Sequence, residues 1–141
     1  MPQLEGECLC GAVKYSVNGD IGDILNCHCS ECRKWHGSAF RTRVIVKKKD
    51  FSWLEGEQFV SRFEGLPTSI KTFCQCCGSN LVSYFRDNDE MLGLPLGAIE
   101  GCLDKKPICH IFVDSKADWY DITDNLPQYA EFPDFSSNIH K

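Results

Sequence analysis

Cysteine is the residue type of this chain whose number and spacing suggest chemistry, with ten cysteines among 141 residues. Eight of them fall in three short clusters, CLC, CHCSEC and CQCC. In order along the chain, the clustered residues are Cys8, Cys10, Cys27, Cys29, Cys32, Cys74, Cys76 and Cys77. A thiolate can act as a nucleophile, a redox partner or a soft metal ligand, and the spacing within each cluster bears on which role it plays.

Metal binding accounts for these clusters better than disulfides or redox pairing. The N-terminal segment lacks the apolar core of an export signal, so we expect the chain to stay in the reducing cytoplasm with free thiols. A CxxC redox pair usually begins a helix in a βαβ pattern, which this sequence lacks. The two cysteines outside the clusters, Cys102 and Cys109, are expected to be buried cysteines without metal.

The first and last clusters can combine into one closed metal site. Cys8 and Cys10 are two positions apart, so on an extended segment both side chains lie on one face. Cys74 and Cys77, followed by a glycine, have the spacing of a zinc knuckle. Together they predict a structural zinc ion held by four thiolates. Cys76 lies inside the knuckle, and an exchange with Cys77 stays open.

The middle cluster is then left with three ligands of its own, Cys27, Cys29 and Cys32. Three protein ligands and an open fourth position are the arrangement of a catalytic zinc ion. Another partition, in which Cys29 and Cys32 join the knuckle, satisfies the same spacing rules but leaves the CLC pair unexplained. His28 lies between two of these cysteines, and we expect it to pack or to support the ligands rather than to bind the metal.

A zinc ion with three thiolates carries a net charge of about −1 and activates water poorly. It is better suited to hold an incoming thiol as its thiolate. If that thiol carries carboxylates, Arg33 is our first candidate to bind them, with Lys34 beside it. Other candidate residues are Trp35 as a wall of the substrate site, His36 and His110 for proton transfer, and Arg41, Arg43 and Lys116 for further positive charge.

Short strands must position these side chains. Alternating or β-branched runs broken by turn residues predict six strands and no long helix. The runs are Ala12–Val17, Ala39–Val46, Gln58–Phe63, Ile70–Phe73, Leu81–Phe85 and Cys109–Val113. A short helix is expected after Cys29, with Ser30 as its cap and Gly37 at its end. From Asp124 onward we predict an irregular tail over the β core, with a frayed end and with Tyr129, Phe132 and Phe135 as packing groups.

Length and charge limit the remaining possibilities. A chain of 141 residues is the size of one domain, which we predict to span residues 1–141 with a core over about 4–130. The net charge of −5 argues against a nucleic-acid partner, which would require a basic face. No window approaches the length of a membrane span, so no membrane partner is expected.

The ordered set of motifs resembles the glutathione-dependent formaldehyde-activating enzyme family, which includes centromere-protein-V-like proteins. The matching segments are CLCGAVKY from Cys8, CHCSECRKWHG from Cys27, FCQCCGSNL from Phe73, GCLD from Gly101 and HIFVDSKADWYDITDNLPQY from His110. The resemblance implies a mainly β, Mss4-like zinc-bearing antiparallel fold with few short helices. It also implies two zinc ions, a structural one on Cys8, Cys10, Cys74 and Cys77 and a catalytic-type one on Cys27, Cys29 and Cys32.

By the same resemblance, the expected activity is that of a carbon–sulfur lyase that joins glutathione and formaldehyde to S-hydroxymethylglutathione. The partner would be a small thiol such as glutathione. The alternative is a non-catalytic zinc module for protein interaction or scaffolding. In that case a further protein ligand would close the three-cysteine site.

Overall fold

The computed structural model describes residues 3–133. Their contacts divide the chain into two compact units. The first unit contains Met1–Ile21 and Val44–Leu103, and the second contains Gly22–Arg43 and Asp104–Lys141. The expectation of a single domain over residues 1–141 stays a prediction. No helix of the described part is long and apolar enough to cross a membrane.

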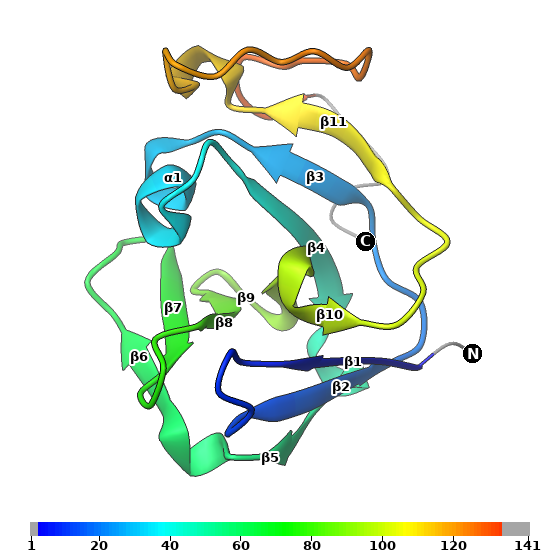
Figure 1. The fold of residues 1–141 in the computed structure, drawn as a ribbon, viewed down its shortest axis with the longest axis vertical. Helices are drawn as coiled ribbons and strands as arrows, with labels where there is room; N and C mark the ends of the chain where they lie inside the picture. The colour runs from blue at the N-terminus through cyan, green and yellow to red at the C-terminus, as the bar shows by residue number, and fades with distance from the viewer. Residues whose placement is uncertain (1–2, 134–141) are drawn as a thin grey trace. The chain divides into compact units, whose positions relative to one another are not determined.

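One sheet of the first unit has the strand order β10-β1-β2-β5 (Figure 1). The strands are β1 (Gln3–Glu7), β2 (Lys14–Asn18), β5 (Phe51–Glu55) and β10 (Ile99–Glu100), and neighbouring strands pair antiparallel. Tyr15 on β2 is buried against the rings of Phe51 and Trp53. Gly6 on β1 leaves room for that ring, because a Cβ there would lie 2.4 Å from Tyr15 Cζ. Packing around the Tyr15 ring therefore joins β1, β2 and β5.

The second sheet of this unit has the order β4-β9-β8-β7-β6. Its strands are β4 (Arg41–Lys47), β6 (Val60–Phe63), β7 (Ser69–Cys74), β8 (Asn80–Phe85) and β9 (Asn88–Pro95). Three single-turn 3₁₀ helices lie between strands: η1 (Lys48–Asp50), η2 (Glu57–Phe59) and η3 (Leu96–Ala98). Strands β7 and β8 are joined by the turn that contains the last cysteine cluster.

The second unit contains β3 (Ile24–Cys27), α1 (Ser30–His36), β11 (Pro107–Ile111) and the 3₁₀ helix η4 (Val113–Ser115). Its strand order is β11-β3-β4, where β4 contributes its first three residues before the chain enters the first unit. The pairing of β11 with β3 is parallel. The segment after η4 returns along β11, where Gln128 forms an isolated bridge with His110.

The predicted mainly β fold with one short α-helix is confirmed. Each of the six expected runs overlaps a strand, whereas β1, β3, β5, β9 and β10 were not predicted. The expected cap of α1 was wrong by one residue, because the side chain of Cys29, not that of Ser30, caps the helix. Gly37 ends the helix in a left-handed conformation with φ of 61°, as expected. The prediction that Cys102 is buried was wrong, because its side chain is exposed, while Cys109 is buried.

Candidate functional site

Four cysteines of the first unit come together as one cluster. The sulfur atoms of Cys8, Cys10, Cys74 and Cys77 all lie within 4.8 Å of one another. The Cys8–Cys10 and Cys10–Cys74 sulfur separations are 3.6 and 3.9 Å. A tetrahedral zinc ion with Zn–S bonds of about 2.3 Å requires sulfur atoms about 3.8 Å apart. These distances fit one ion held by four thiolates, and they are far too long for a disulfide bond.

Two turns hold these sulfur atoms in place. In the first, the backbone N–H of Val13 donates to Cys8 Sγ at 3.2 Å. In the second, Cys76 N–H donates to Cys74 Sγ at 3.4 Å. The Leu9 N–H donates to Ser79 Oγ at 2.8 Å, which ties one turn to the other. N–H groups aimed at sulfur favour the thiolate form that a metal ion requires.

The thiols of this cluster differ in acidity. A hydrogen bond with Ser79 lowers the pKa of Cys77 to about 6, so a thiolate is present there at neutral pH. Burial raises the pKa of Cys74 to about 12 in the free thiol state. Cys76 is exposed and does not join the four clustered sulfur atoms. Cys77 therefore occupies the position that the sequence left open between these two residues.

The second cluster belongs entirely to the second unit. Cys27 is the last residue of β3, Cys29 caps α1, and Cys32 lies in the first turn of that helix. Their three sulfur atoms lie within 4.8 Å of one another. Cys27 and Cys32 are buried and Cys29 is partly exposed. The end of β3 and the start of α1 thus bring three soft ligands together, and the middle one is partly exposed.

The three thiols of this cluster differ in pKa. Hydrogen bonds from Cys27 and Cys32 lower the pKa of Cys29, and the backbone N–H groups of the first turn of α1 add to this effect. The same contacts with Cys29 and Cys32 raise the pKa of Cys27. The first thiolate of this cluster therefore forms at Cys29. A soft cation that replaces the shared protons would relieve the competition among the three sulfur atoms.

Two arginines at the start of β4 face this cluster from within the unit. Arg41 and Arg43 are only 4% and 8% exposed. They are two positions apart on one strand, so they lie on the same face. Burial lowers the pKa of Arg41 to about 10, and the neighbouring Cys32 partly opposes this shift. Burial also lowers the pKa of Arg43, against the charges of the three clustered cysteines. Both guanidinium groups remain charged at neutral pH.

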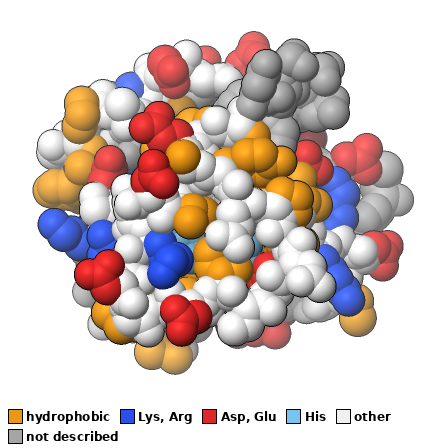
Figure 2. Space-filling model, turned by 90° about the horizontal axis from the view of Figure 1, so that it is seen from above, with side chains coloured by type: hydrophobic (Ala, Val, Ile, Leu, Met, Phe, Trp, Pro, Cys, Tyr) orange, Lys and Arg blue, Asp and Glu red, His pale blue; other side chains and the backbone are white. Residues whose placement is uncertain are grey.

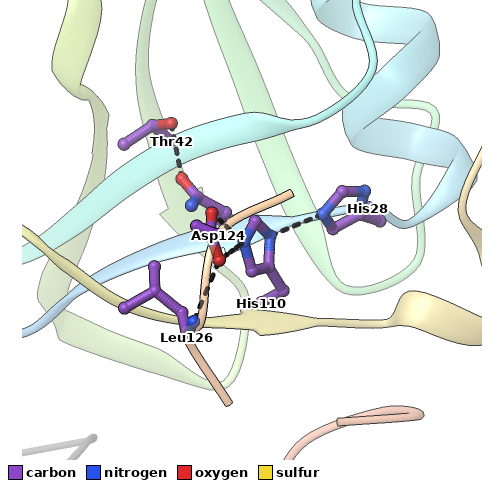
Figure 3. Close-up of polar contacts among 6 residues, drawn as sticks. His28, Thr42, His110, Asp124 and Leu126 are labelled. Carbon is purple, nitrogen blue, oxygen red and sulfur yellow. Dashed lines mark hydrogen bonds and ion pairs between the residues drawn. The ribbon is translucent and has the colours of Figure 1, made fainter. Parts of the chain in front are cut away.

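A chain of polar side chains, two buried histidines and an exposed carboxylate, lies on the other face of β3 and β11 (Figure 3). His28 Nε2 is 2.8 Å from His110 Nδ1, and His110 Nε2 is 3.0 Å from Asp124 Oδ2. The Leu126 N–H donates to Asp124 Oδ1 at 3.0 Å. The carboxylate accepts from His110 Nε2–H, and in the tautomer with this proton alone His110 Nδ1 accepts from His28 Nε2–H. In this arrangement His28 carries its proton on Nε2. Its hydrogen bond with His110 holds the backbone between Cys27 and Cys29 in place.

Both histidines are covered, because His28 is fully buried and His110 is 1% exposed. On the face drawn in Figure 2, histidine side chains are almost hidden between apolar side chains. Burial and the neighbouring His110 lower the pKa of His28 to about 4. His110 alternates along β11 with Cys109 and Ile111, which pack with the cysteine cluster, so its ring points away from that cluster. This position does not suit the proton transfer that the sequence suggested for His110.

The residues predicted to bind substrate lie on or beside α1. Arg33 Nε donates to the backbone oxygen of Ser115 at 3.1 Å. Trp35 is partly buried under the guanidinium of Arg41, whose Cζ is 4.8 Å from the ring centroid. The ring of His36 lies 4.8 Å from that of Trp35. Lys116 Nζ donates to the backbone oxygens of Ala117 and Tyr120, so it stabilises the loop in which it lies.

The chain matches the model of one protein family and is similar to two named proteins. The model of a family described as glutathione-dependent formaldehyde-activating enzyme matches residues 3–115. A Schizosaccharomyces pombe protein named an uncharacterized lyase is 27% identical, with 81% of this chain and 88% of that protein covered. A Halomonas elongata protein with a provisional name as a glutathione-dependent formaldehyde-activating enzyme is 29% identical, with 94% and 90% covered.

A solved structure is also similar. It is the crystal structure of a Rhodobacter sphaeroides protein, with a TM-score of 0.58 and 26% sequence identity. The match covers 71% of this chain and 91% of that chain.

Proposed function

Since the chain belongs to the glutathione-dependent formaldehyde-activating enzyme family, we propose that it is a zinc-dependent enzyme of the carbon–sulfur lyase type. Its substrates would be a small thiol such as glutathione and formaldehyde, and its product S-hydroxymethylglutathione. The observation that carries the proposal is the group of three cysteines of the second unit, whose sulfur atoms lie within 4.8 Å of one another. Three ligands leave a fourth position for an incoming thiol.

Two zinc ions per chain are part of this proposal. Cys8, Cys10, Cys74 and Cys77 would hold a structural ion, because four ligands close a tetrahedral site. Cys27, Cys29 and Cys32 would hold the second ion, which when bound lowers the pKa of a thiol ligand and so supplies a thiolate at neutral pH.

The reaction joins the thiol sulfur to the carbonyl carbon. One C–S bond forms, the π electrons of the C=O bond move to oxygen, and oxygen takes up the proton that the thiol released. His36, at the end of α1, is our candidate for carrying that proton. Trp35 and Arg33, from the same helix, would line the substrate site. The ten free cysteines suit the reducing cytoplasm as the compartment of this enzyme.

The test is the exchange of ¹³C-formaldehyde with its glutathione adduct, followed by NMR on the zinc-loaded protein. We expect the protein to accelerate exchange above the uncatalysed rate. Cys29→Ser should abolish the acceleration and keep the circular dichroism spectrum. Cys102→Ser, which changes an exposed cysteine outside both clusters, should leave the rate unchanged. Equal rates for wild type and Cys29→Ser, or no acceleration by wild type, would favour a non-catalytic zinc module instead.

A further inference from the structure

Arg41 and Arg43 form a pair of buried cations without enough partners. Within residues 3–133, Arg41 Nε and Nη2 and Arg43 Nη1 are buried and make no hydrogen bond. The two residues are two positions apart on the same face of β4, so their guanidinium groups are neighbours. A buried, unsatisfied donor is costly, and a buried charge more so. The fold therefore holds two cations ready for an anion.

The cysteine cluster does not balance this charge by itself once a metal ion is bound. Three thiolates and one zinc ion sum to about −1, and the two guanidinium groups add +2. An incoming thiolate on the fourth position would bring this sum to about zero, so the unpaired donors, and not the charge alone, support a carboxylate contact. This arrangement favours a negatively charged ligand over a neutral one, in a protein whose net charge is −5.

The unpartnered atoms of Arg41 also define the shape of that anion. Nε–H and one N–H of Nη2 point in parallel from the same edge of the guanidinium. This edge matches the two oxygens of a carboxylate. The Cζ of the same group lies 4.8 Å from the centroid of the Trp35 ring, and this cation–π contact restrains the side chain. The donor edge is thus rigid, and lysine could not reproduce it.

We propose that Arg41, with Arg43 beside it, binds a carboxylate of the thiol substrate, so that the site selects thiols that carry a carboxylate group. The inference rests on the proposed function and deepens it. It also moves the carboxylate contact from Arg33 to β4. The Nε of Arg33 is already bonded to the Ser115 backbone and its side chain is partly exposed, whereas Nε and Nη2 of Arg41 are buried and make no hydrogen bond.

The test uses S-methylglutathione, which keeps both carboxylates and has no thiol to react. Its binding to the zinc-loaded full chain is measured by isothermal titration calorimetry. We expect Arg41→Lys to raise Kd at least about tenfold, because the charge remains but the bidentate edge is lost. The diethyl ester of S-methylglutathione should bind wild type at least about tenfold more weakly, with no further loss in Arg41→Lys.

Lys106→Gln, which removes an exposed charge of the same unit, is the matched control and should change Kd by less than about twofold. Zinc content and circular dichroism are measured for every variant. If Arg41→Lys does not fold, Arg43→Lys, which likewise keeps the charge and removes a guanidinium, is measured in its place. Equal binding of the acid and the ester, no binding to wild type, or an unchanged Kd in the arginine variant would overturn the inference.

The outcomes separate this inference from the proposed function. Arg41-dependent binding without acceleration of formaldehyde exchange would uphold the carboxylate site and reject the enzyme. Acceleration with equal binding of acid and ester would uphold the enzyme and reject the carboxylate site.

Discussion

Replacing Cys74 with serine should remove much of the stability of the zinc-loaded protein. Cys10 and Cys74 are 64 positions apart, and their sulfur atoms are 3.9 Å apart. A link across a loop of this length lowers the entropy of the unfolded chain, by about 4 kcal/mol on the relation used for covalent cross-links. A domain of this size is stable by only about 5–15 kcal/mol. The lost link alone therefore accounts for a large share of the free energy of unfolding.

The assay is urea unfolding of zinc-loaded wild type and Cys74→Ser, with zinc content measured on the same samples. With a urea dependence of about 2 kcal/mol per molar, a loss of about 4 kcal/mol lowers the midpoint by about 2 M. The matched control is Cys76→Ser, which changes an exposed cysteine in the same turn, outside the four clustered sulfur atoms. Its midpoint should stay within about 0.3 M of wild type, because exposed substitutions change stability by less than about 0.5 kcal/mol.

A wild-type midpoint and an unchanged zinc content in Cys74→Ser would contradict a stabilising site on these four cysteines. Equal destabilisation of Cys76→Ser and Cys74→Ser would also contradict it, because the turn rather than the four-sulfur cluster would then account for the loss.

Three further outcomes are expected. Because the pKa of His28 is lowered to about 4, the unfolded chain binds more protons below pH 6.5, so the free energy of unfolding should fall by about 3 kcal/mol between pH 6.5 and 4. Urea titrations across this range should show a smaller fall in His28→Gln; equal falls would contradict the assignment. Gly56→Ala should destabilise by at least about 2 kcal/mol in thermal unfolding, because φ is +79° and a Cβ would lie 1.9 Å from a backbone oxygen, whereas Gly97→Ala, with open space, should be nearly neutral. Asp124→Asn should place its NH₂ against His110 and move the His110 proton to Nδ1, which ¹⁵N shifts would report; an unchanged tautomer would refute the hydrogen-bond assignment.

Local patterns in the sequence predicted the strands in which polar and apolar side chains alternate or in which β-branched and aromatic residues are frequent. The run before Cys74 shows β-branched and aromatic residues, and β7 covers it. The segments that became β1 and β9 contain acidic residues and a glycine, which weaken a strand pattern. Their pairing comes from neighbouring strands, which single-segment reasoning does not include.

The sequence by itself determined which sulfur atoms could act together at short range. Spacing of two or three residues brings side chains to one face or one turn, so Cys27, Cys29 and Cys32 could be grouped without a structure. The order of the motifs along the chain was also enough to identify the family, because such motifs are recognised from sequence alone.

Tertiary structure alone decided the contacts between distant segments. Cys10 meets Cys74 because two turns are tied together, and spacing could not choose this partition over its rival. His110 and Asp124 join His28 only where β11 pairs with β3. The arginines of β4 were visible as an alternating pair, but the burial of donor atoms that make no hydrogen bond is a property of the packed core. Proximity and desolvation depend on which surfaces the fold removes from water, and no local pattern records that choice.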